Sequence, residues 1–423
     1  MTKSEVSLVG TAVKPVVVEY LFGDRTYEAK LLYGMGALEG LKTLPDASVH
    51  VCCTSPPYWG LRDYGTAPQV WGDGWVGSLG LEPTPEIYVE HLVEVFREVK
   101  RVLRSDGTLW LNLGDTYAAS PKGNPGALSR GLSNQGRCTA RANAHRTRST
   151  IVGDLKAKDL VGIPWMVAFA LRKRGWYLRS NIIWSKPWGM PEAVKDRPTR
   201  AHEDLFLLAK KERYFYDAAA IAEAAKDPRG YKYEPGTYRE MMVAATLEGK
   251  TPDSNRQHVG NTRVNGKCLK YAAGLGESRN VRSVWRISPH AYPGAHFATF
   301  PPELVSRMIR AGSSVGGCCP TCGSPLRRAV LGTRGKVGAS GLGWDPTCKC
   351  FVGNSAPCTV LDPFSGSGTT GAVAVRNGRN YVGLDVQEKY LPLARARILG
   401  MAAPEEAVGD EAGGVFDMFG GRG

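Results

Sequence analysis

The stretch TVLDPFSGSGTTGAVAVR, residues 359–376, decides the fold of this chain. Its apolar start predicts a strand and its end predicts a helix, and between them Gly366, Gly368 and Gly371 have the spacing of a nucleotide-binding turn. Asp385 closes the next predicted strand, nineteen residues after Gly366. A carboxylate at that place can accept hydrogen bonds from both hydroxyls of a ribose. The sequence therefore predicts an α/β fold that binds a nucleoside cofactor.

The residues around the glycines narrow the kind of cofactor. A phosphate-binding P-loop is excluded because no lysine follows the glycines. A dinucleotide is the alternative, but Asp362 stands directly at the turn. Its carboxylate would repel a pyrophosphate and would tolerate or attract a cationic sulfonium. The pattern favours S-adenosylmethionine.

A second predicted strand, 49–53, runs into Thr54-Ser55-Pro56-Pro57-Tyr58. Two prolines cannot continue a central strand, so the backbone must leave the sheet there. The hydroxyl of Ser55 and the carbonyl of Pro56 could accept the protons of an exocyclic amine and turn its lone pair toward a methyl group. Tyr58, with Trp59 assisting, offers a face on which a flipped base could stack. An ordinary proline turn at a strand end is the alternative.

The rest of the apolar pattern alternates between helix and strand. We expect an amphipathic helix over residues 86–104 that ends at Asp106-Gly107, and a further helix over 160–173. Strands are expected at 108–113, 177–184 and 204–209. This order predicts a doubly wound, mostly parallel sheet. Residues 1–30 are a polar, weakly patterned N-terminal segment to which we assign no function.

Taken together, these motifs resemble the β class of amino-methylating DNA methyltransferases, of bacterial or phage type. The resemblance spans residues 31–399 and includes GTLWLNLGDTY at 107–117, IIWSKP at 182–187, DRPTRAHEDLFLLAKKERYFY at 196–216 and HFATFP at 296–301. It implies a permuted order, with a catalytic half at 31–223 and a cofactor half at 291–400. The sequence departs from the family pattern in two places: Met35-Gly36 replaces a frequent Gly-Asp pair, and Phe300 replaces a lysine.

The resemblance also implies roles for individual residues. The active-site loop would consist of Ser55, Pro56, Pro57 and Tyr58, and the cofactor would be bound by Asp362, Pro363, Phe364, Gly366, Gly368, Thr369, Asp385, Phe297 and Pro301. Family members with Ser before Pro-Pro-Tyr are more often cytosine-N4 enzymes, whereas Asp or Asn there usually means adenine N6. The expected reaction is direct methyl transfer from S-adenosylmethionine to cytosine N4 in duplex DNA after base flipping. Adenine-N6 methylation, RNA methylation and an inactive DNA-binding homologue are the alternatives.

Basic segments suggest where DNA would bind. The 423 residues carry a formal charge of +14, which favours a polyanionic partner. Residues 118–150 contain no acid and are expected to contact phosphates. Residues 224–290, where aromatic side chains are interleaved with basic ones, are the predicted target-recognition region. A solvated insertion is the alternative for both. The phosphate contacts would come from Arg130, Arg137, Arg141, Arg146 and Arg148.

Cysteines predict a metal site within residues 316–352. Two close pairs, Cys319 with Cys322 and Cys348 with Cys350, could supply four thiolates to a structural zinc, as in zinc ribbons. Cys318 and Cys358 leave the choice of ligands open. Cys52 and Cys53 precede the prolines on an apolar strand, so we interpret them as core thiols and not as nucleophiles of cytosine-C5 methylation.

The ends of the chain add expectations about location and partners. The N-terminus lacks the layout of a signal peptide and no segment is apolar enough to span a membrane, so we expect a cytoplasmic, nucleoid-associated protein in a bacterial or phage-infected cell. Residues 401–423 are predicted to be an acidic, disordered tail. Their run 415–419 weakly resembles peptides that bind sliding clamps, with a meaningless terminal run as the alternative. A cognate restriction endonuclease is a further possible partner.

Overall fold

The computed structural model describes residues 15–22, 25–61, 63–119, 150–187, 194–224, 278–289, 300–329 and 343–401. The chain divides into a larger unit, Met1–Asp217 with Ser283–Gly423, and a smaller one, Ala218–Arg282. The described elements of the smaller unit are η1 (Ala218–Ile221) and an antiparallel pair of β9 (Glu223–Ala224) and β10 (Ser278–Arg279). Glu223 forms an ion pair with Arg279 across this strand pair, at 3.4 Å.

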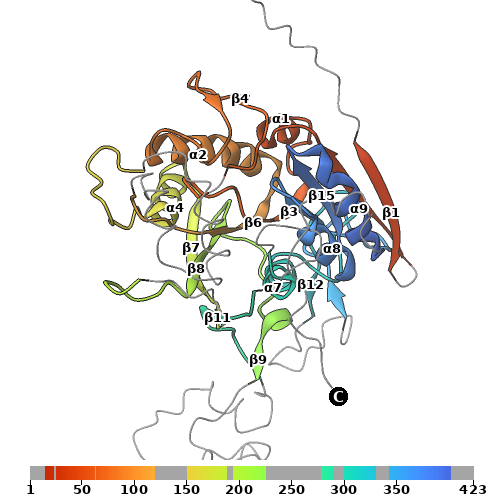
Figure 1. Ribbon diagram of the computed structural model, residues 1–423. Coiled ribbons are helices and arrows are strands. Elements are labelled where there is room, and N and C mark those ends of the chain that lie inside the picture. The colour runs from red at the N-terminus through yellow and green to blue at the C-terminus, as the bar shows by residue number, and fades with distance from the viewer. Residues whose placement is uncertain are drawn as a thin grey trace, which may run out of the picture. The chain divides into compact units, whose positions relative to one another are not determined.

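Nine described strands of the larger unit form one sheet in the order β1-β2-β15-β14-β3-β6-β8-β7-β11 (Figure 1). Five neighbouring pairs are parallel, whereas β8 is antiparallel to both of its neighbours and β1 to β2. The expected mostly parallel sheet is therefore confirmed. Its strands are β1 (Val16–Phe22), β2 (Arg25–Tyr33), β3 (Val49–Thr54), β6 (Leu103–Leu113), β7 (Tyr177–Ser185), β8 (His202–Ala209), β11 (Val284–Arg286), β14 (Thr359–Asp362) and β15 (Asn380–Asp385).

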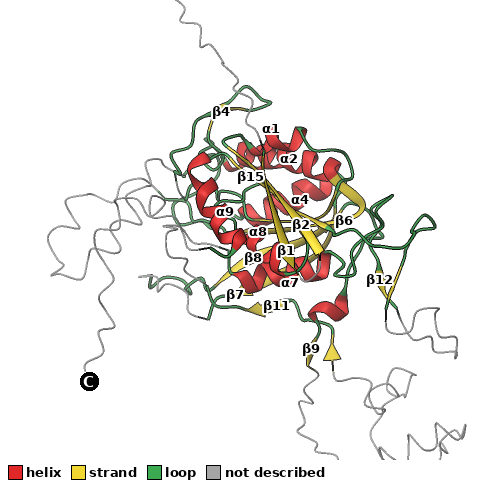
Figure 2. Cartoon of the chain, turned by 90° about the vertical axis from the view of Figure 1, so that its right-hand side faces the viewer, coloured by secondary structure: helices red, strands yellow, loops and turns green. Residues whose placement is uncertain are grey.

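Helices pack against both faces of this sheet (Figure 2). One group is α1 (Ala37–Lys42), α2 (Pro85–Val102) and α4 (Ile163–Lys173); the other is α7 (Pro302–Gly312), α8 (Thr369–Arg376) and α9 (Leu391–Leu399), which follows the short η2 (Glu388–Tyr390). In α2 the Thr84 hydroxyl accepts from the Ile87 amide, Pro85 begins the helix, and Tyr88, Leu92 and Phe96 share its buried face. Among the described helices, none is both long and apolar enough to cross a membrane.

Short strand pairs lie outside the main sheet. They are β4 (Gln69–Val70) with β5 (Val76–Gly77), and β12 (Arg327–Arg328) with β13 (Trp344–Asp345), both antiparallel. The second pair belongs to the cysteine-rich insertion predicted at 316–352.

The two halves of the chain meet at the centre of the sheet. Strand β3, from the predicted catalytic half, and β14, from the predicted cofactor half, are parallel neighbours, with Val51 opposite Val360 and Cys52 opposite Leu361. All six residues of β3 are buried, as expected of a central parallel strand. Because the carboxyl ends of parallel strands share one edge, the loop after β3 and the loop after β14 emerge side by side, which is where open α/β sheets bind ligands.

One predicted boundary was wrong, and one pair of strands was not predicted. The helix predicted over residues 86–104 ends at Val102, and β6 begins at Leu103, because Leu103 already pairs with Val49 of β3. Asp106-Gly107 therefore lies inside a strand. Residues 16–22 and 25–33, for which no element was predicted, form a hairpin that extends the sheet, because β2 pairs in parallel with β15.

Candidate active site

The loops after β3 and β14 are joined by a buried carboxyl group. Asp362 Oδ1 accepts hydrogen bonds from Thr54 Oγ1 at 2.6 Å and from the Phe364 amide at 3.1 Å, and its Oδ2 accepts from Thr370 Oγ1 at 2.6 Å. The residue is only 3% exposed. Burial raises the pKa of Asp362 to about 6, although these three hydrogen bonds favour the charged form. Its carboxyl group thus links the predicted catalytic loop to the predicted cofactor loop.

The glycine turn offers space for a ligand. Gly366 has a φ of +50°, and a Cβ added there would meet no heavy atom within 4 Å. At Gly368, with a φ of +76°, a Cβ would lie 2.9 Å from Ala394 of α9. The first glycine therefore leaves the backbone open to an approaching ligand, and the second allows helix α9 to pack closely on the turn.

Asp385 is held at the edge of this open space. Its Oδ2 accepts from the Gly366 amide at 2.7 Å and its Oδ1 from the Gln387 amide at 2.8 Å. Burial raises the pKa of Asp385 to about 6, against the effect of these two amides. Each oxygen keeps lone-pair capacity for a further donor. The arrangement fits the ribose contact expected from the sequence.

Three of the other predicted cofactor residues belong to the same turn, and two come from elsewhere in the chain. Pro363 is buried and Phe364 is partly buried, and Thr369 begins α8 with 5% of its surface exposed. Pro301 is buried and precedes the first turn of α7. Phe297 lies outside the described residues.

The loop from Ser55 to Tyr58 is fixed by hydrogen bonds to distant elements. Ser55 Oγ lies 3.1 Å from the Tyr58 hydroxyl, and the Tyr88 hydroxyl of α2 donates to the Pro57 carbonyl at 2.7 Å. Gly114, just after β6, makes room for the Tyr58 ring, because a Cβ there would lie 2.4 Å from its Cε2. We expected Trp59 to assist in base stacking, but this expectation was wrong. Its side chain is only 2% exposed, and its Nε1 donates to the Glu82 carbonyl.

Three polar residues that the sequence motifs did not indicate, Asn112, Lys186 and Glu203, complete this region. The Tyr58 hydroxyl donates to Glu203 Oε2 at 2.8 Å, and Asn112 Nδ2 lies 2.7 Å from both the Tyr58 hydroxyl and Glu203 Oε2. Lys186 Nζ forms an ion pair with Glu203 Oε1. Burial, followed by the charge of Glu203, raises the pKa of Tyr58 well above its usual value, so the phenol stays protonated.

A sequence signal for these residues existed. Asn112 interrupts the apolar run of β6 near its carboxyl end, Lys186 follows β7, and Glu203 is near the start of β8. Because β8 runs antiparallel to β6 and β7, its first residues reach the same sheet edge as their last ones. Polar residues at these three strand ends could therefore have been predicted to meet, had the direction of β8 been known.

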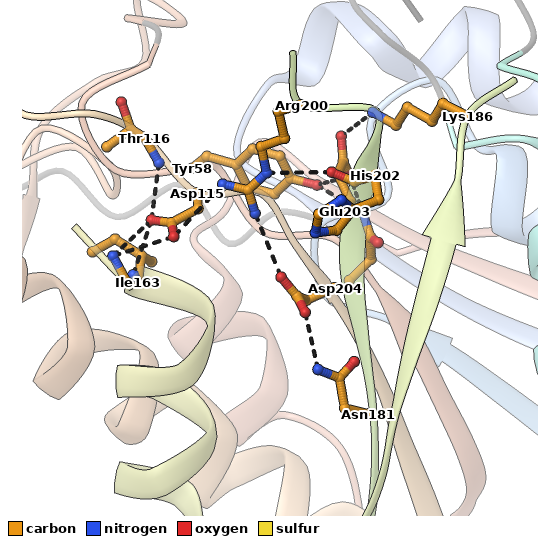
Figure 3. Close-up of polar contacts among 12 residues, drawn as sticks. Tyr58, Asp115, Thr116, Ile163, Asn181, Lys186, Arg200, His202, Glu203 and Asp204 are labelled. Carbon is orange, nitrogen blue, oxygen red and sulfur yellow. Dashed lines mark hydrogen bonds and ion pairs between the residues drawn. The ribbon is translucent and has the colours of Figure 1, made fainter. Parts of the chain in front are cut away.

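A neighbouring set of polar residues, Asp115, Arg200 and Asp204, connects helix α4 to strand β8 (Figure 3). Asp115 Oδ1 accepts from the amides of Gly162 and Ile163, both at 3.0 Å, and so satisfies donors at the start of α4. Arg200 lies 3.6 Å from Asp115 and 3.5 Å from Asp204. These contacts attach α4 to the edge of β8 beside the catalytic loop.

Comparison with known proteins identifies the family. A model of the DNA methylase family of N6- and N4-methyltransferases matches residues 49–319 and 358–396. The chain belongs to this family. It is a DNA methyltransferase that transfers a methyl group from S-adenosylmethionine to an exocyclic amino group of a base, as the motifs predicted.

Alignments with individual relatives cover most of the chain. The Type II methyltransferase M.Cfr9I of Citrobacter freundii is 36% identical over 388 residues, which cover 91% of this chain and 94% of the relative. M.SmaI of Serratia marcescens is 35% identical and covers 86% of this chain and 87% of the relative. Among solved structures, the cytosine-N4-specific PvuII DNA methyltransferase is 18% identical, with a TM-score of 0.45 and coverage of 90% of this chain and 89% of its own.

The cysteine insertion of the methyltransferase contains the predicted quartet. The sulfur atoms of Cys319, Cys322, Cys348 and Cys350 all lie within 4.8 Å of one another. Cys318 and Cys358, whose assignment the sequence left open, instead lie near His50 in a separate buried cluster. Both ring nitrogens of His50 contact the backbone, one with the Thr359 amide and the other with the Gly323 carbonyl. Neither nitrogen is left for a metal in this arrangement.

The predicted DNA contacts fall outside the described residues. This applies to Arg130, Arg137, Arg141, Arg146 and Arg148, to most of the predicted recognition region at 224–290, and to nearly all of the C-terminal tail. They remain predictions.

Proposed function

We propose that this methyltransferase modifies the N4 atom of cytosine in a specific duplex sequence, with adenine N6 as the alternative target. The observation that carries the proposal is Ser55 at the first position of the active-site loop, with its hydroxyl in hydrogen-bonding contact with Tyr58. In the class that the chain resembles, serine at this position accompanies cytosine-N4 activity more often than adenine-N6 activity.

The residues of the site account for direct methyl transfer. A flipped base would stack on Tyr58, with its amino protons accepted by Ser55 Oγ and the Pro56 carbonyl, so that the nitrogen lone pair points along the line of attack. When bound, S-adenosylmethionine supplies an electrophilic methyl group. Asp385 would accept from the ribose hydroxyls, and Asp362 holds the loops in register.

A covalent intermediate on cysteine does not fit this site. Cys52 and Cys53 are completely buried, and burial raises the pKa of both thiols well above the usual value. Since the thiolate is the reactive form, neither is suited to the nucleophilic attack that cytosine-C5 methylation requires.

Analysis of the methylated product tests the proposed target. Purified protein is incubated with labelled S-adenosylmethionine and unmethylated duplex DNA, and the DNA is digested to nucleosides and analysed by mass. We expect N4-methylcytosine. N6-methyladenine would overturn the target assignment alone, and equal labelling of a matched RNA would argue against a DNA-restricted role.

We also propose a structural zinc ion on Cys319, Cys322, Cys348 and Cys350. Four clustered thiols match the donor set of a closed tetrahedral zinc site. We expect about one zinc per chain by elemental analysis, retained by Cys358→Ser and lost from Cys348→Ser with a lower melting temperature. A metal-free wild-type protein that keeps the same melting temperature after addition of zinc would contradict the assignment.

The biological setting follows from the relatives and the charge. We propose that the arginines of residues 118–150 contact DNA phosphates, that residues 224–290 read the target sequence, and that the enzyme protects sites from a cognate restriction endonuclease in the cytoplasm, as the Type II names of the relatives suggest. Charge-reversal of two or more of these arginines should weaken DNA binding and reduce its salt dependence.

A further inference from the structure

The hydrogen bonds from Glu203 to Ser55 have a direction that chemistry dictates. Glu203 is ion-paired with Lys186, and an ionised carboxylate can only accept hydrogen bonds. The Tyr58 hydroxyl must therefore use its single proton on Glu203, 2.8 Å away. The raised pKa of Tyr58 is consistent with a phenol that keeps this proton.

The next link in the chain follows from the first. With its proton committed, the Tyr58 oxygen can only accept in its remaining contacts. It accepts from Asn112 Nδ2 at 2.7 Å, because the two protons of this amide point to Tyr58 and Glu203. The contact of 3.1 Å with Ser55 must then have Ser55 as the donor. The one proton of the Ser55 hydroxyl is thus directed at Tyr58, and the Oγ lone pairs are left for another donor.

We propose that Glu203 is a positioning residue that fixes the Ser55 hydroxyl as an acceptor for the amino group to be methylated. The proposal rests on the function proposed above, in which Ser55 accepts a proton of the target amine. Were Ser55 to donate to that nitrogen, it would occupy the lone pair that must attack the methyl group. Glu203 prevents this from a distance, through Tyr58, without touching the base.

The same chain can carry away the proton that the reaction releases. As the nitrogen–carbon bond forms and the carbon–sulfur bond breaks, with its electron pair moving to sulfur, the nitrogen becomes cationic and must lose a proton. Ser55 Oγ can take that proton while its own passes to Tyr58 and the phenolic proton passes to Glu203 Oε2. Glu203 is 17% exposed at its side chain, so solvent can then remove the proton.

Glu203→Gln is the variant that separates this role from simple support of the Tyr58 ring. Glutamine keeps the size and a hydrogen bond to Tyr58, but its amide can also donate, so Tyr58 becomes free to donate to Ser55 and reverse the chain. We expect the single-turnover rate of methyl transfer, with saturating S-adenosylmethionine and duplex DNA, to fall roughly 10- to 100-fold, since a misdirected donor at a reacting centre costs up to this order. Dissociation constants for both ligands should stay within about twofold. Glu90→Gln, which alters an exposed pair with Arg174, is the control and should leave the rate unchanged.

A double-mutant cycle with Tyr58→Phe makes the test decisive. Phenylalanine retains a ring for stacking but breaks the chain, so adding Glu203→Gln to it should slow the reaction by less than about twofold. An equal slowing in both backgrounds, a change confined to the KM for DNA, or no slowing of the wild-type background would each overturn the positioning role.

A second variant keeps the test informative if Glu203→Gln lowers the melting temperature markedly. Lys186→Met then takes the place of Glu203→Gln in the double-mutant cycle. It should lower the single-turnover rate by a smaller factor, and this decrease must likewise vanish in the Tyr58→Phe background. The methylated base is identified in the same digests, so an adenine product would refute the cytosine assignment independently of these rate ratios.

Discussion

The cofactor loop and the catalytic loop lie side by side but are assembled in different ways. The contacts of the glycine turn come mostly from its own strand, turn, helix and strand: Asp362 binds Phe364 and Thr370, and Asp385 binds Gly366 and Gln387. All of these residues fall within a short continuous segment. Local sequence alone therefore specifies most of the cofactor site.

The catalytic loop depends on residues that only the fold brings together. Tyr58 contacts Asn112 of β6 and Glu203 of β8, which are 54 and 145 residues away in the sequence. The contact with Glu203 exists because β8 enters the sheet antiparallel to β6. Cofactor binding and methyl transfer should therefore be separable by mutation, since the contacts that support the two loops hardly overlap.

Substitution of Ser55 is expected to separate methyl transfer from cofactor binding most strongly. Ser55→Ala removes the proposed acceptor of the amine proton, and loss of one such preorganised contact typically lowers kcat roughly 100- to 1,000-fold. Binding of S-adenosylmethionine should be unaffected, because the cofactor loop supplies its own contacts. Single-turnover kinetics measures the rate of methyl transfer, and calorimetry on the same preparation measures the affinity for S-adenosylmethionine. A variant that also loses cofactor affinity would mean that the two loops are coupled at this residue.

Asp385 should show the opposite pattern. Asp385→Ala removes the carboxylate assigned to the ribose, so the Kd for S-adenosylmethionine should rise about 10- to 100-fold, as expected for lost hydrogen bonds to a charged group. At saturating cofactor, kcat should change little. Calorimetric titration measures the Kd, and an unchanged value would remove Asp385 from the cofactor site.

The binding of the cofactor should also depend on pH through this residue. The ionised carboxylate is the better acceptor, and its pKa is about 6. Affinity should therefore weaken as the pH falls below about 6. Asp385→Asn should flatten this dependence, and the same steep profile in the variant would assign it to another group.

The cofactor loop could be predicted from the sequence to a greater extent than the surroundings of the catalytic loop. Strands β3, β14 and β15 and the turn at Gly366 were predicted, because periodicity and glycine spacing are local signals. The contact of Glu203 with Tyr58 was not predicted, because it depends on the direction of β8, which apolar periodicity does not reveal. The hairpin of β1 and β2 was also missed, although buried Tyr27, Ala29 and Leu31 alternate with charged residues, which is a local signal of a half-buried strand.

The smallest expected effect lies where the two loops meet, at Asp362. Its ordinary pKa is 3.8 and burial raises it to about 6 in the folded protein. Between these values the folded state binds more protons than the unfolded state. This residue therefore makes the wild type less stable as the pH rises from about 4, and the effect levels off above about pH 6, once the carboxyl group is ionised in the folded state as well. Asp362→Asn lacks this titration. Relative to wild type, the unfolding free energy of the variant should therefore rise by about 1 to 3 kcal/mol over this interval.

Urea unfolding without cofactor, at several pH values, measures this difference. Asp196→Asn is the matched control, because the exposed Asp196 is paired with Lys158 and its pKa is lowered. Its difference from wild type should have the opposite sign and be smaller. A pH-independent difference for Asp362→Asn would mean that this carboxyl ionises as freely as one in water. The hydrogen bond from Thr54 to Asp362 would then not lie in a buried environment. This direct link between the cofactor loop and the catalytic loop would lose its physical basis.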